Sequence, residues 1–332
     1  MKDCLLSIII PIYQVEDYIA DCLYSICRQN LKDYSWFEVV CVNDGTKDKS
    51  MDVVRRIVCE YPNLRFKVID KKNEGVSVAR NVGYINADGR YLWFVDSDDV
   101  ILDGALELFY QEISLDCYDL VIGQYNKSSK IDINQSVFRG RNKRHIAFYS
   151  SCIRRQLLDE NNIQFVEGVA YGEDLLFFET AQFLAKSQKK MPNVVYVYRQ
   201  RVGSAMNSNS EIQELKYIES LERRLELYSE LDLKYCSTIS LEDKFRKKYF
   251  LNLRDAVVRN IMLFHLRYNK KEPWELLQEL KEKGVYPYRL RWNDLCEFYA
   301  ISDYIIKVLC FLFPFSWYYK FAVKCYSLCV RK

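Results

Sequence analysis

In the first hundred residues, short segments rich in apolar residues alternate with segments of helical spacing. The apolar-rich segments, each followed by polar residues, cover Leu5–Ile12, Phe37–Val42, Leu64–Ile69 and Tyr91–Val95. The segments between them place apolar residues three and four positions apart, and they cover Glu16–Gln29, Asp48–Tyr61 and Gly75–Asn86. Strands that alternate with helices of this length are typical of βαβ units. The pattern therefore predicts an α/β fold with a mostly parallel sheet and helices on both faces.

The pattern after residue 100 is mixed at first and then becomes helical. Strands are predicted at Tyr118–Gly123 and Val194–Tyr198, and helices at Ile153–Asn161 and Asp174–Ala185. The polar segment Asn126–Lys143 is interpreted as a loop. Three later segments show helical spacing alone, namely Glu211–Leu231, Leu241–Tyr268 and Pro273–Lys283. We therefore expect an α/β domain over residues 1–225 and a helical region over residues 226–332.

Composition narrows the classes of protein that fit this pattern. Of 332 residues, 49% are apolar and 28% are charged, which is enough to bury a core and excludes wholesale disorder. The net charge of +3 does not indicate a nucleic-acid partner, because such proteins usually carry a larger basic excess. The twelve cysteines form no CxxC pair, and the chain has two histidines. We expect reduced, mostly buried thiols rather than a zinc site or a disulfide framework, which favours a cytoplasmic protein.

Two apolar segments resemble export or membrane signals. Leu5–Tyr13 contains Pro11, and no small-residue cleavage site follows it, so a buried strand explains it better than a signal peptide. The longest apolar stretch, Val308–Trp317, is too short to span a bilayer. We expect neither a secretion signal nor a transmembrane helix.

Polar residues suited to ligand binding follow the predicted strands, and in such sheets ligands bind at the carboxyl ends of the strands. Asp44 and Gly45 come directly after the second strand. A carboxylate followed by glycine gives a tight turn with a fixed acceptor for a base or a ribose. The alternative is a simple helix-capping turn, with Asp48 as the cap of the next helix.

A second motif leads from the third strand into a helix. It contributes the candidate ligand-binding residues Asn73, Gly75, Ser77 and Arg80. A helix N-terminus offers free N–H groups, and arginine adds a permanent charge with a fork that matches phosphate or carboxylate. The motif could hold a diphosphate or the carboxylates of the next motif, or it could be an ordinary surface helix with a solvated arginine.

The third motif is acidic. Asp96, Asp98 and Asp99 lie within four residues after the fourth strand, and their mutual repulsion favours a neutralising cation. Oxygen ligands alone suit Mg²⁺ or Mn²⁺, which reach out to substrate phosphates. The alternative is a solvated acidic turn.

The fourth motif is the pair Glu173 and Asp174, which opens a predicted helix. Acidic residues in a first turn are ordinary capping chemistry. No histidine falls in any of these motifs, however, so a general base among them would have to be a carboxylate.

In their order along the chain, these motifs resemble those of the family 2 glycosyltransferases. The resemblance covers roughly residues 5 to 205 and is carried by Ser7-Ile8-Ile9-Ile10-Pro11-Ile12-Tyr13, Val42-Asn43-Asp44-Gly45-Thr46, Asn73-Glu74-Gly75 through Gly83, Asp96-Ser97-Asp98-Asp99 and Gly172-Glu173-Asp174. It implies the GT-A fold, a Rossmann-like and mostly parallel sheet, and an inverting enzyme that uses a nucleotide-diphosphate sugar.

The resemblance also implies roles for single residues. On the donor side it assigns the nucleotide contact to Pro11, Tyr13 and Glu16, and the base or ribose to Asp44. Asn73, Gly75, Ser77 and Arg80 join this nucleotide-sugar-binding set. From the acidic motif, Asp96 would bind the ribose and assist the metal, Asp98 would coordinate the metal, and Asp99 would lie beside the donor sugar or the acceptor. Asp174 is preferred to Glu173 as the general base.

One departure from the family pattern concerns the diphosphate. Where the family often has a histidine shortly after a Tyr-Arg pair, this chain has Arg201 after Tyr198-Arg199. Arginine does not ligate metals but can neutralise a diphosphate directly. The alternative is a solvated loop charge.

The function implied by the resemblance is transfer of a sugar to an acceptor hydroxyl, with Mn²⁺ or Mg²⁺ as cofactor. A UDP-sugar is the favoured donor, and a glycan or lipid-linked molecule is the acceptor, as in surface polysaccharide or glycolipid assembly. Two alternatives remain. A nucleotidyltransferase lacks support because no Gly-rich basic signature follows the first strand. A catalytically silent sugar-nucleotide-binding subunit is disfavoured because acids fill the metal and base positions.

The last segment, residues 301–332, combines a net charge of +4 with nine aromatic residues. Aromatic and apolar residues interleaved with lysine and arginine suit a segment that lies in a membrane interface. We therefore expect a peripheral protein at the inner face of the plasma membrane. The alternative is a tail that packs on the catalytic domain.

Overall fold

The computed structural model describes residues 4–131, 134–139, 147–169, 171–200 and 211–236, with Val257, Ile261 and Glu282 as single residues. The chain divides into two compact units between Ser210 and Glu211. The boundary expected at residue 225 lies inside the helix α7 (Glu211–Cys236), which begins the second unit. A division there would interrupt a continuous ladder of helical hydrogen bonds, so the division precedes the helix.

The first unit is built around a nine-stranded sheet with the order β3-β2-β1-β4-β8-β6-β9-β5, in which β7 pairs with β9. The four strands predicted in the first hundred residues are present and parallel to one another. They are β1 (Leu6–Ile12), β2 (Phe37–Asp44), β3 (Arg65–Lys71) and β4 (Tyr91–Phe94). All seven residues of β1 are buried, because helices cover both faces of the sheet at its centre.

The other half of the sheet is mixed. The strand β8 (Ser151–Arg154) is antiparallel to both β4 and β6 (Leu120–Ser128). The strand β9 (Gln188–Arg199) runs parallel to β6 and antiparallel to two short strands, β5 (Val100–Ile101) and β7 (Phe138–Arg139). The half of the sheet formed by β1 to β4 is therefore parallel, whereas the other half contains both parallel and antiparallel pairs. The α/β class is as expected.

Two expectations about this half are wrong. The predicted loop over residues 126–143 begins with the last residues of β6 and also contains β7. The end of β6 is polar, but its backbone pairs with β9 after a register shift near Gln124, and strand pairing needs no apolar side chain. The helix expected from Ile153 begins later, as α5 (Arg155–Asn161), because Ile153 belongs to β8.

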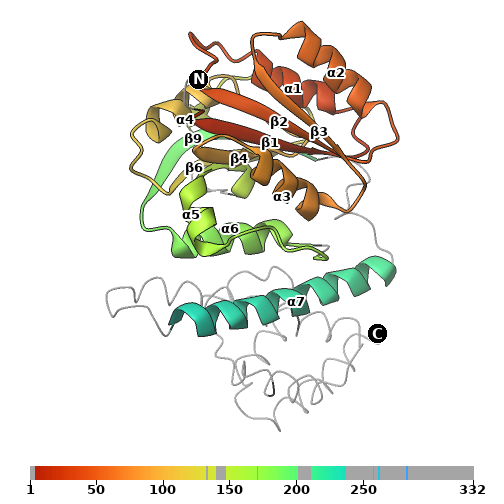
Figure 1. Ribbon diagram of the computed structural model, residues 1–332, viewed down its shortest axis with the longest axis vertical. Helices are drawn as coiled ribbons and strands as arrows, with labels where there is room; N and C mark the ends of the chain where they lie inside the picture. The colour runs from red at the N-terminus through yellow and green to blue at the C-terminus, as the bar shows by residue number, and fades with distance from the viewer. Residues whose placement is uncertain are drawn as a thin grey trace, which may run out of the picture. The chain divides into compact units, whose positions relative to one another are not determined.

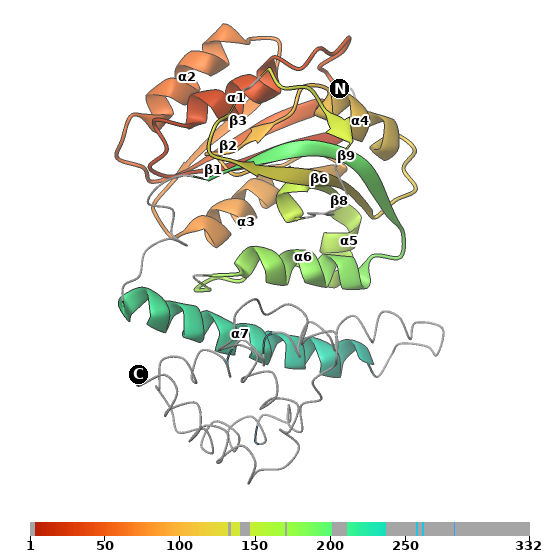
Figure 2. The same cartoon turned by 180° about the vertical axis from the view of Figure 1, so that it is seen from behind.

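Helices cover both faces of the sheet (Figures 1 and 2). On one face lie α1 (Ile19–Cys27), α2 (Ser50–Glu60) and α4 (Ala105–Ile113). On the other face lie α3 (Val76–Asn86), α5 and α6 (Glu173–Leu184), with the short 3₁₀ turn η1 (Phe148–Ser150) before β8. One large apolar core joins the sheet to these helices.

The cysteines of the described part of the chain are free thiols, as expected. Cys4, Cys22, Cys27, Cys41 and Cys152 are buried, whereas Cys59 and Cys117 are exposed. Burial raises the pKa of the Cys41 thiol to about 12, which keeps it protonated and unreactive.

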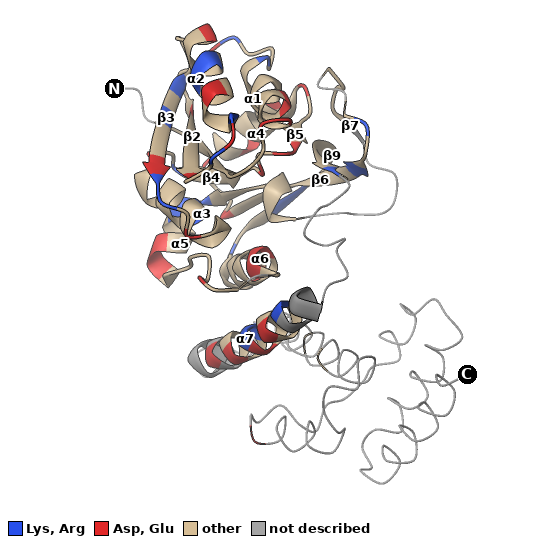
Figure 3. Ribbon diagram, turned by 90° about the vertical axis from the view of Figure 1, so that its right-hand side faces the viewer, with Lys and Arg blue, Asp and Glu red and all other residues tan. Residues whose placement is uncertain are grey.

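In the second unit the structure describes chiefly α7, an amphipathic helix. Ile218, Leu221, Leu225 and Tyr228 are buried and recur three and four positions apart. Charged residues of both signs lie along the same helix (Figure 3). The later predicted helices and the tail at 301–332 lie outside the described residues. Within the described part of the chain, none of the helices has the length and apolar character needed to cross a bilayer.

Candidate active site

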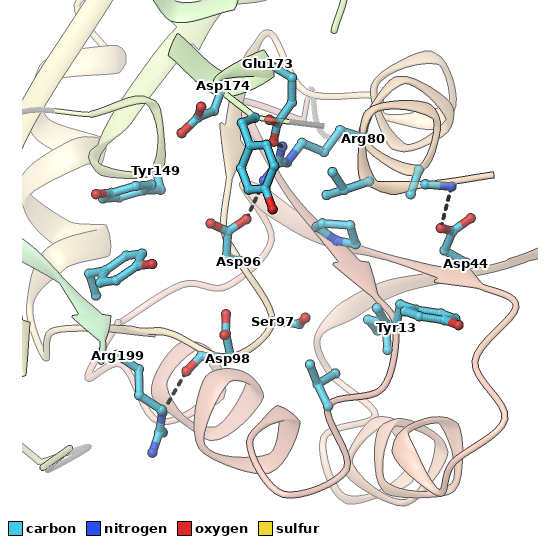
Figure 4. A pocket seen from close by; sticks show the side chains of 18 of the residues that line it. Tyr13, Asp44, Arg80, Asp96, Ser97, Asp98, Tyr149, Glu173, Asp174 and Arg199 are labelled. Atoms are coloured by element: carbon cyan, nitrogen blue, oxygen red, sulfur yellow. Dashed lines mark hydrogen bonds and ion pairs between the residues drawn. The ribbon is translucent and has the colours of Figure 1, made fainter. Parts of the chain in front are cut away.

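A cavity of about 560 Å³ lies at the carboxyl ends of the parallel strands (Figure 4). The predicted site residues that line it are Pro11, Tyr13, Asp44, Asn73, Gly75, Arg80, Asp96, Asp98, Glu173 and Asp174. Asp44 and Tyr13 lie at one end and Asp174 and Tyr149 at the other, with Asp96 between them. Residues from five separate loops and strand ends thus meet in one place, as the topology predicts.

Three predicted residues, Glu16, Ser77 and Asp99, do not line the cavity. The Glu16 carboxylate accepts the backbone N–H of Lys49 at 2.8 Å and so joins the loops that follow β1 and β2. Ser77 is buried in α3. Asp99 is buried elsewhere, as described below, and Arg201 lies outside the described residues.

Asp44 is held rigidly at the end of β2. Its Oδ1 accepts from Lys71 Nζ at 2.7 Å and from the backbone N–H of Glu74 at 3.0 Å, while Oδ2 accepts the N–H of Gly75 at 2.9 Å. Gly75 has a φ of +96°, a conformation that favours glycine and lets its N–H turn toward this carboxylate. The second motif is thereby drawn to the first, and Asp44 becomes a fixed acceptor at this end of the cavity.

Arg80 binds the carboxylates of two other motifs. Its Nη2 lies 2.7 Å from Asp96 Oδ1, and its Nη1 lies 2.9 Å from Glu173 Oε1. The guanidinium is buried over the rings of Phe148 and Phe165. Burial opposes its charge, but Asp96 and Glu173 outweigh that effect and raise the Arg80 pKa. The structure shows the carboxylate contacts that the sequence left open for Arg80, and Arg80 also lines the cavity.

Glu173 and Asp174 differ in their surroundings although they are adjacent in sequence. They begin α6 after Gly172, which takes a left-handed conformation with φ +78°. Burial raises the pKa of Glu173, and the opposing charge of Arg80 does not fully offset it. Asp174 faces the cavity, and its Oδ1 accepts the backbone N–H of Leu175 at 2.8 Å. Glu173 is the member of this pair that forms the 2.9 Å ion pair with Arg80.

The acidic turn after β4 presents two of its carboxylates to the cavity. Asp96 and Asp98 line the cavity, whereas Asp99 is 1% exposed and does not. Asp99 Oδ2 accepts the hydroxyl of Tyr196 at 2.7 Å, and Oδ1 accepts the backbone N–H of Arg199 at 2.7 Å. The place expected for Asp99 beside the donor sugar or the acceptor is corrected, since its carboxylate fastens the turn to β9.

Several residues that line the cavity were not predicted from the sequence, above all Arg199, Tyr149 and Tyr198. Arg199 and Tyr198 end β9, and a strand end was the available signal for them. Tyr149 lies in η1, where the sequence gives no pattern that separates a cavity residue from a core residue.

Oxygen ligands for a cation are present in part. Asp96 and Asp98 both face the cavity, and two carboxylates with substrate phosphates and water are an ordinary set for Mg²⁺ or Mn²⁺. Within the described ranges, no group of three or more His, Cys, Asp or Glu side chains is arranged to hold a metal by itself.

Comparison with known proteins gives one family. Residues 7–168 match the family model described as glycosyl transferase family 2. The chain is 30% identical over 241 residues to a protein of Bacillus subtilis (strain 168) named uncharacterized glycosyltransferase EpsJ. The aligned region covers 67% of each of the two chains. For other curated relatives the matched part is between 17% and 64% of their length. The activities of those whole proteins are therefore not transferred to this chain.

Two solved structures share the fold. Residues 1–349 of TarS from S. aureus, in complex with UDP-GlcNAc, align with a TM-score of 0.56 and 23% identity over 86% of this chain and 94% of that one. The mannosyltransferase PcManGT from Pyrobaculum calidifontis, in complex with GDP-Man and Mn²⁺, aligns with a TM-score of 0.53 and 14% identity over 93% and 87%. At these identities the likeness shows the fold alone.

Proposed function

Since this chain belongs to glycosyl transferase family 2, we propose that it moves a sugar from a nucleotide-diphosphate sugar to an acceptor hydroxyl with inversion. The observation that carries the proposal is the Arg80 bridge. It holds Asp96, from the acidic turn, and Glu173, beside Asp174, on one buried guanidinium. The bridge thus holds the acidic turn, proposed for the donor, next to the segment that carries Asp174, proposed for the acceptor, as a direct displacement needs.

The nucleotide is assigned to the end of the cavity that holds Asp44. A carboxylate held by Lys71 and two backbone N–H groups is a rigid acceptor for the N–H of a uracil-type base. Tyr13 lines the same end and offers a ring for stacking. We favour a UDP-sugar as donor, and the TarS structure of the same fold contains UDP-GlcNAc.

The residues present fit a divalent cation. Asp96 uses one oxygen for Arg80, and Asp98 lines the cavity beside it, so carboxylate oxygens are presented where a diphosphate would lie. Mn²⁺ or Mg²⁺ bound there would neutralise the charge that develops on the diphosphate leaving group. PcManGT, which has the same fold, contains Mn²⁺ with its sugar nucleotide.

Asp174 is assigned as the general base. The Glu173 carboxylate is engaged in its ion pair with Arg80, so it would have to leave that pair to reach an acceptor hydroxyl. Asp174 faces the cavity without sharing that pair. It takes the proton of the acceptor hydroxyl as the oxygen attacks the anomeric carbon on the face opposite the diphosphate, and a single displacement inverts the configuration.

A donor panel with two matched variants tests this assignment. Incubation with UDP-, GDP- and dTDP-sugars should release the nucleoside diphosphate in one case. Asp174→Asn should lower that rate by about 10²–10⁴-fold, the usual effect of a general base, while UDP binding is unchanged. Glu173→Gln is the control, because it also replaces a carboxylate by an amide, at the neighbouring position.

The outcomes separate the alternatives. A nearly normal Asp174→Asn and an inactive Glu173→Gln would reverse the assignment of the base. Donor binding without turnover for any donor would indicate the silent binding subunit. Release of pyrophosphate from a nucleoside triphosphate and a sugar phosphate would indicate the nucleotidyltransferase.

The acceptor is proposed to be a glycan or lipid-linked molecule in the assembly of a surface polysaccharide or glycolipid. The basic and aromatic composition of residues 301–332 supports contact with the inner face of the plasma membrane, where a lipid-linked acceptor would lie.

A further inference from the structure

Arg199 lies where three segments of the first unit meet. Its Nε donates to the backbone oxygen of Asp98 at 2.7 Å, and its Nη2 lies 2.7 Å from Asp21 Oδ2 on α1. Its own backbone N–H donates to Asp99 at 2.7 Å. The side chain is 13% exposed, and its guanidinium lies over the ring of Tyr18. One arginine at the end of β9 thus connects the acidic turn to α1.

We propose that Arg199 is a positioning residue that sets Asp98 in place for the divalent cation, with Asp21 as its anchor. This inference rests on the proposed function, because it concerns the cation of the same site. It assigns a role to Arg199 that is different from contact with the diphosphate, the role that the sequence suggested for Arg201.

The choice of atoms supports positioning. Arg199 bonds the backbone oxygen of Asp98 rather than its carboxylate, so this contact orients the turn and leaves the Asp98 side chain out of the bond. The guanidinium donors are fixed in one plane, and the bonds to Asp98 and Asp21 use different nitrogens. Because the guanidinium is held by Asp21 on one side and bonds the Asp98 backbone oxygen on the other, it restricts where the Asp98 backbone can lie.

The charges around the acidic turn also support a positioning role for Arg199. The acidic turn carries Asp96, Asp98 and Asp99, which repel one another until a cation binds. Arg80 compensates Asp96, and Arg199 places a second positive charge beside the turn on the side of Asp98. The turn can therefore hold its shape before the cation arrives, which lowers the free energy needed to order the ligands.

The experiment compares Arg199→Gln with Arg28→Gln, the same change at an exposed arginine just after α1. Mn²⁺ binding to the complex of the full chain with UDP is measured by electron paramagnetic resonance of free Mn²⁺. UDP binding with chelator present and thermal unfolding are measured in parallel. Asp21→Asn is the second variant, and it removes the anchor while Arg199 remains.

We expect Arg199→Gln to raise the dissociation constant for Mn²⁺ by about 10- to 100-fold, the usual effect of losing a residue that orients a metal ligand. Asp21→Asn should raise it in the same direction but less. UDP binding without metal should be unchanged, and kcat at saturating Mn²⁺ should fall much less than the affinity for Mn²⁺. Arg199→Lys should not restore the affinity, because lysine is a point charge that does not reach both partners in fixed geometry. A chain that carries both Arg199→Gln and Asp21→Asn should bind Mn²⁺ no more weakly than a chain with Arg199→Gln alone.

Three results would overturn the inference. Equal Mn²⁺ affinity in Arg199→Gln and Arg28→Gln, or in Asp21→Asn and the wild type, would remove the positioning role while the proposed function stands. If Arg199→Gln weakened UDP binding in the presence of chelator as much as it weakened Mn²⁺ binding, Arg199 would contact the diphosphate. If the wild-type chain binds neither UDP nor Mn²⁺, both the inference and the proposed function fail.

Discussion

At the scale of single residues, the carboxylates of the cavity differ in how their charge is compensated. Asp44 is paired with Lys71, while Asp96 and Glu173 share Arg80. These three carboxylates each lie within 3 Å of a cationic nitrogen, so their placement is fixed before any ligand binds. In the proposed mechanism the metal and the proton are handled by two other carboxylates that line the cavity, Asp98 and Asp174.

Removal of the divalent cation, and of its proposed ligand Asp98, tests whether turnover depends on the metal. Chelation of divalent ions should abolish turnover, and Mn²⁺ or Mg²⁺ should restore it. Asp98→Asn should abolish turnover with little effect on thermal unfolding, because Asp98 is a partly exposed cavity residue rather than a core residue.

Asp99→Asn provides the contrast. The Asp99 carboxylate accepts from Tyr196 and from the Arg199 backbone, and an amide cannot accept with both of its ends. This change should lower the free energy of unfolding by about 1–3 kcal/mol while the metal dependence of turnover remains. Full activity of Asp98→Asn in the presence of chelator would refute the metal site.

The acidic turn also shows why part of the site could not be predicted. The position of a carboxylate cluster at the end of a strand is visible in the sequence, and Asp96 and Asp98 do line the cavity. Which side of the turn each carboxylate faces depends on Tyr196 and Arg199, a hundred residues later in the chain. Local pattern carries no information about such a distant partner, so Asp99 was misplaced and Arg199 was missed.

At the scale of elements, the contact between α3 and β1 determines where Arg80 lies. Gly83 faces the sheet, and a Cβ built on it would lie 2.4 Å from Ile9 Cγ2 and 3.2 Å from Val42 Cγ2. The helix therefore packs on the strands through a residue without a side chain. Arg80 lies one turn earlier on the same helix, so its 2.7 Å contact with Asp96 depends on this close approach.

Gly83→Ala should separate α3 from the sheet. Forcing an extra carbon into a packed core costs about 1–3 kcal/mol, and the better helix propensity of alanine offsets only part of it. We expect a lower melting temperature and weaker UDP binding, measured by thermal unfolding and calorimetry. Ile85→Ala on the same helix is the control, since Ile85 is 67% exposed. Unchanged stability and affinity in Gly83→Ala would mean that the helix position does not set the site.

The elements differ in how well pattern predicted them. The strands β1 and β2 are rich in apolar residues and buried on both faces, and these segments were recognised. The strand β8 has four residues and begins with a serine, and the end of β6 is polar. Their pairing comes from backbone hydrogen bonds to neighbours distant in sequence, which a local apolar pattern does not record.

At the scale of the whole molecule, every residue of the described cavity belongs to the first unit. The role of the tail at residues 301–332 stays a prediction, because it lies outside the described part of the chain. A test of the tail therefore does not disturb the residues on which the proposed chemistry depends.

Flotation with anionic liposomes tests the tail. The full chain should float with the liposomes at low salt and less so at high salt, since each basic residue near an anionic surface contributes about 1 kcal/mol. A chain that ends at Asn293 should stay in solution. Equal flotation of both chains, or of neither at low salt, would exclude the tail as a membrane contact.

The late position of β9 has a consequence for how the protein acquires its shape during synthesis. The first four strands of the sheet are complete by Phe94, and their pairing can proceed while later residues are still being added by the ribosome. The acidic turn is then present, but Tyr196 and Arg199, which fasten it, are translated a hundred residues later. The region that matches the family model ends at residue 168, before both of them. A nascent chain of that length would contain most of the sheet and an unfastened acidic turn, so affinity for the divalent cation should arise late and abruptly as the chain grows.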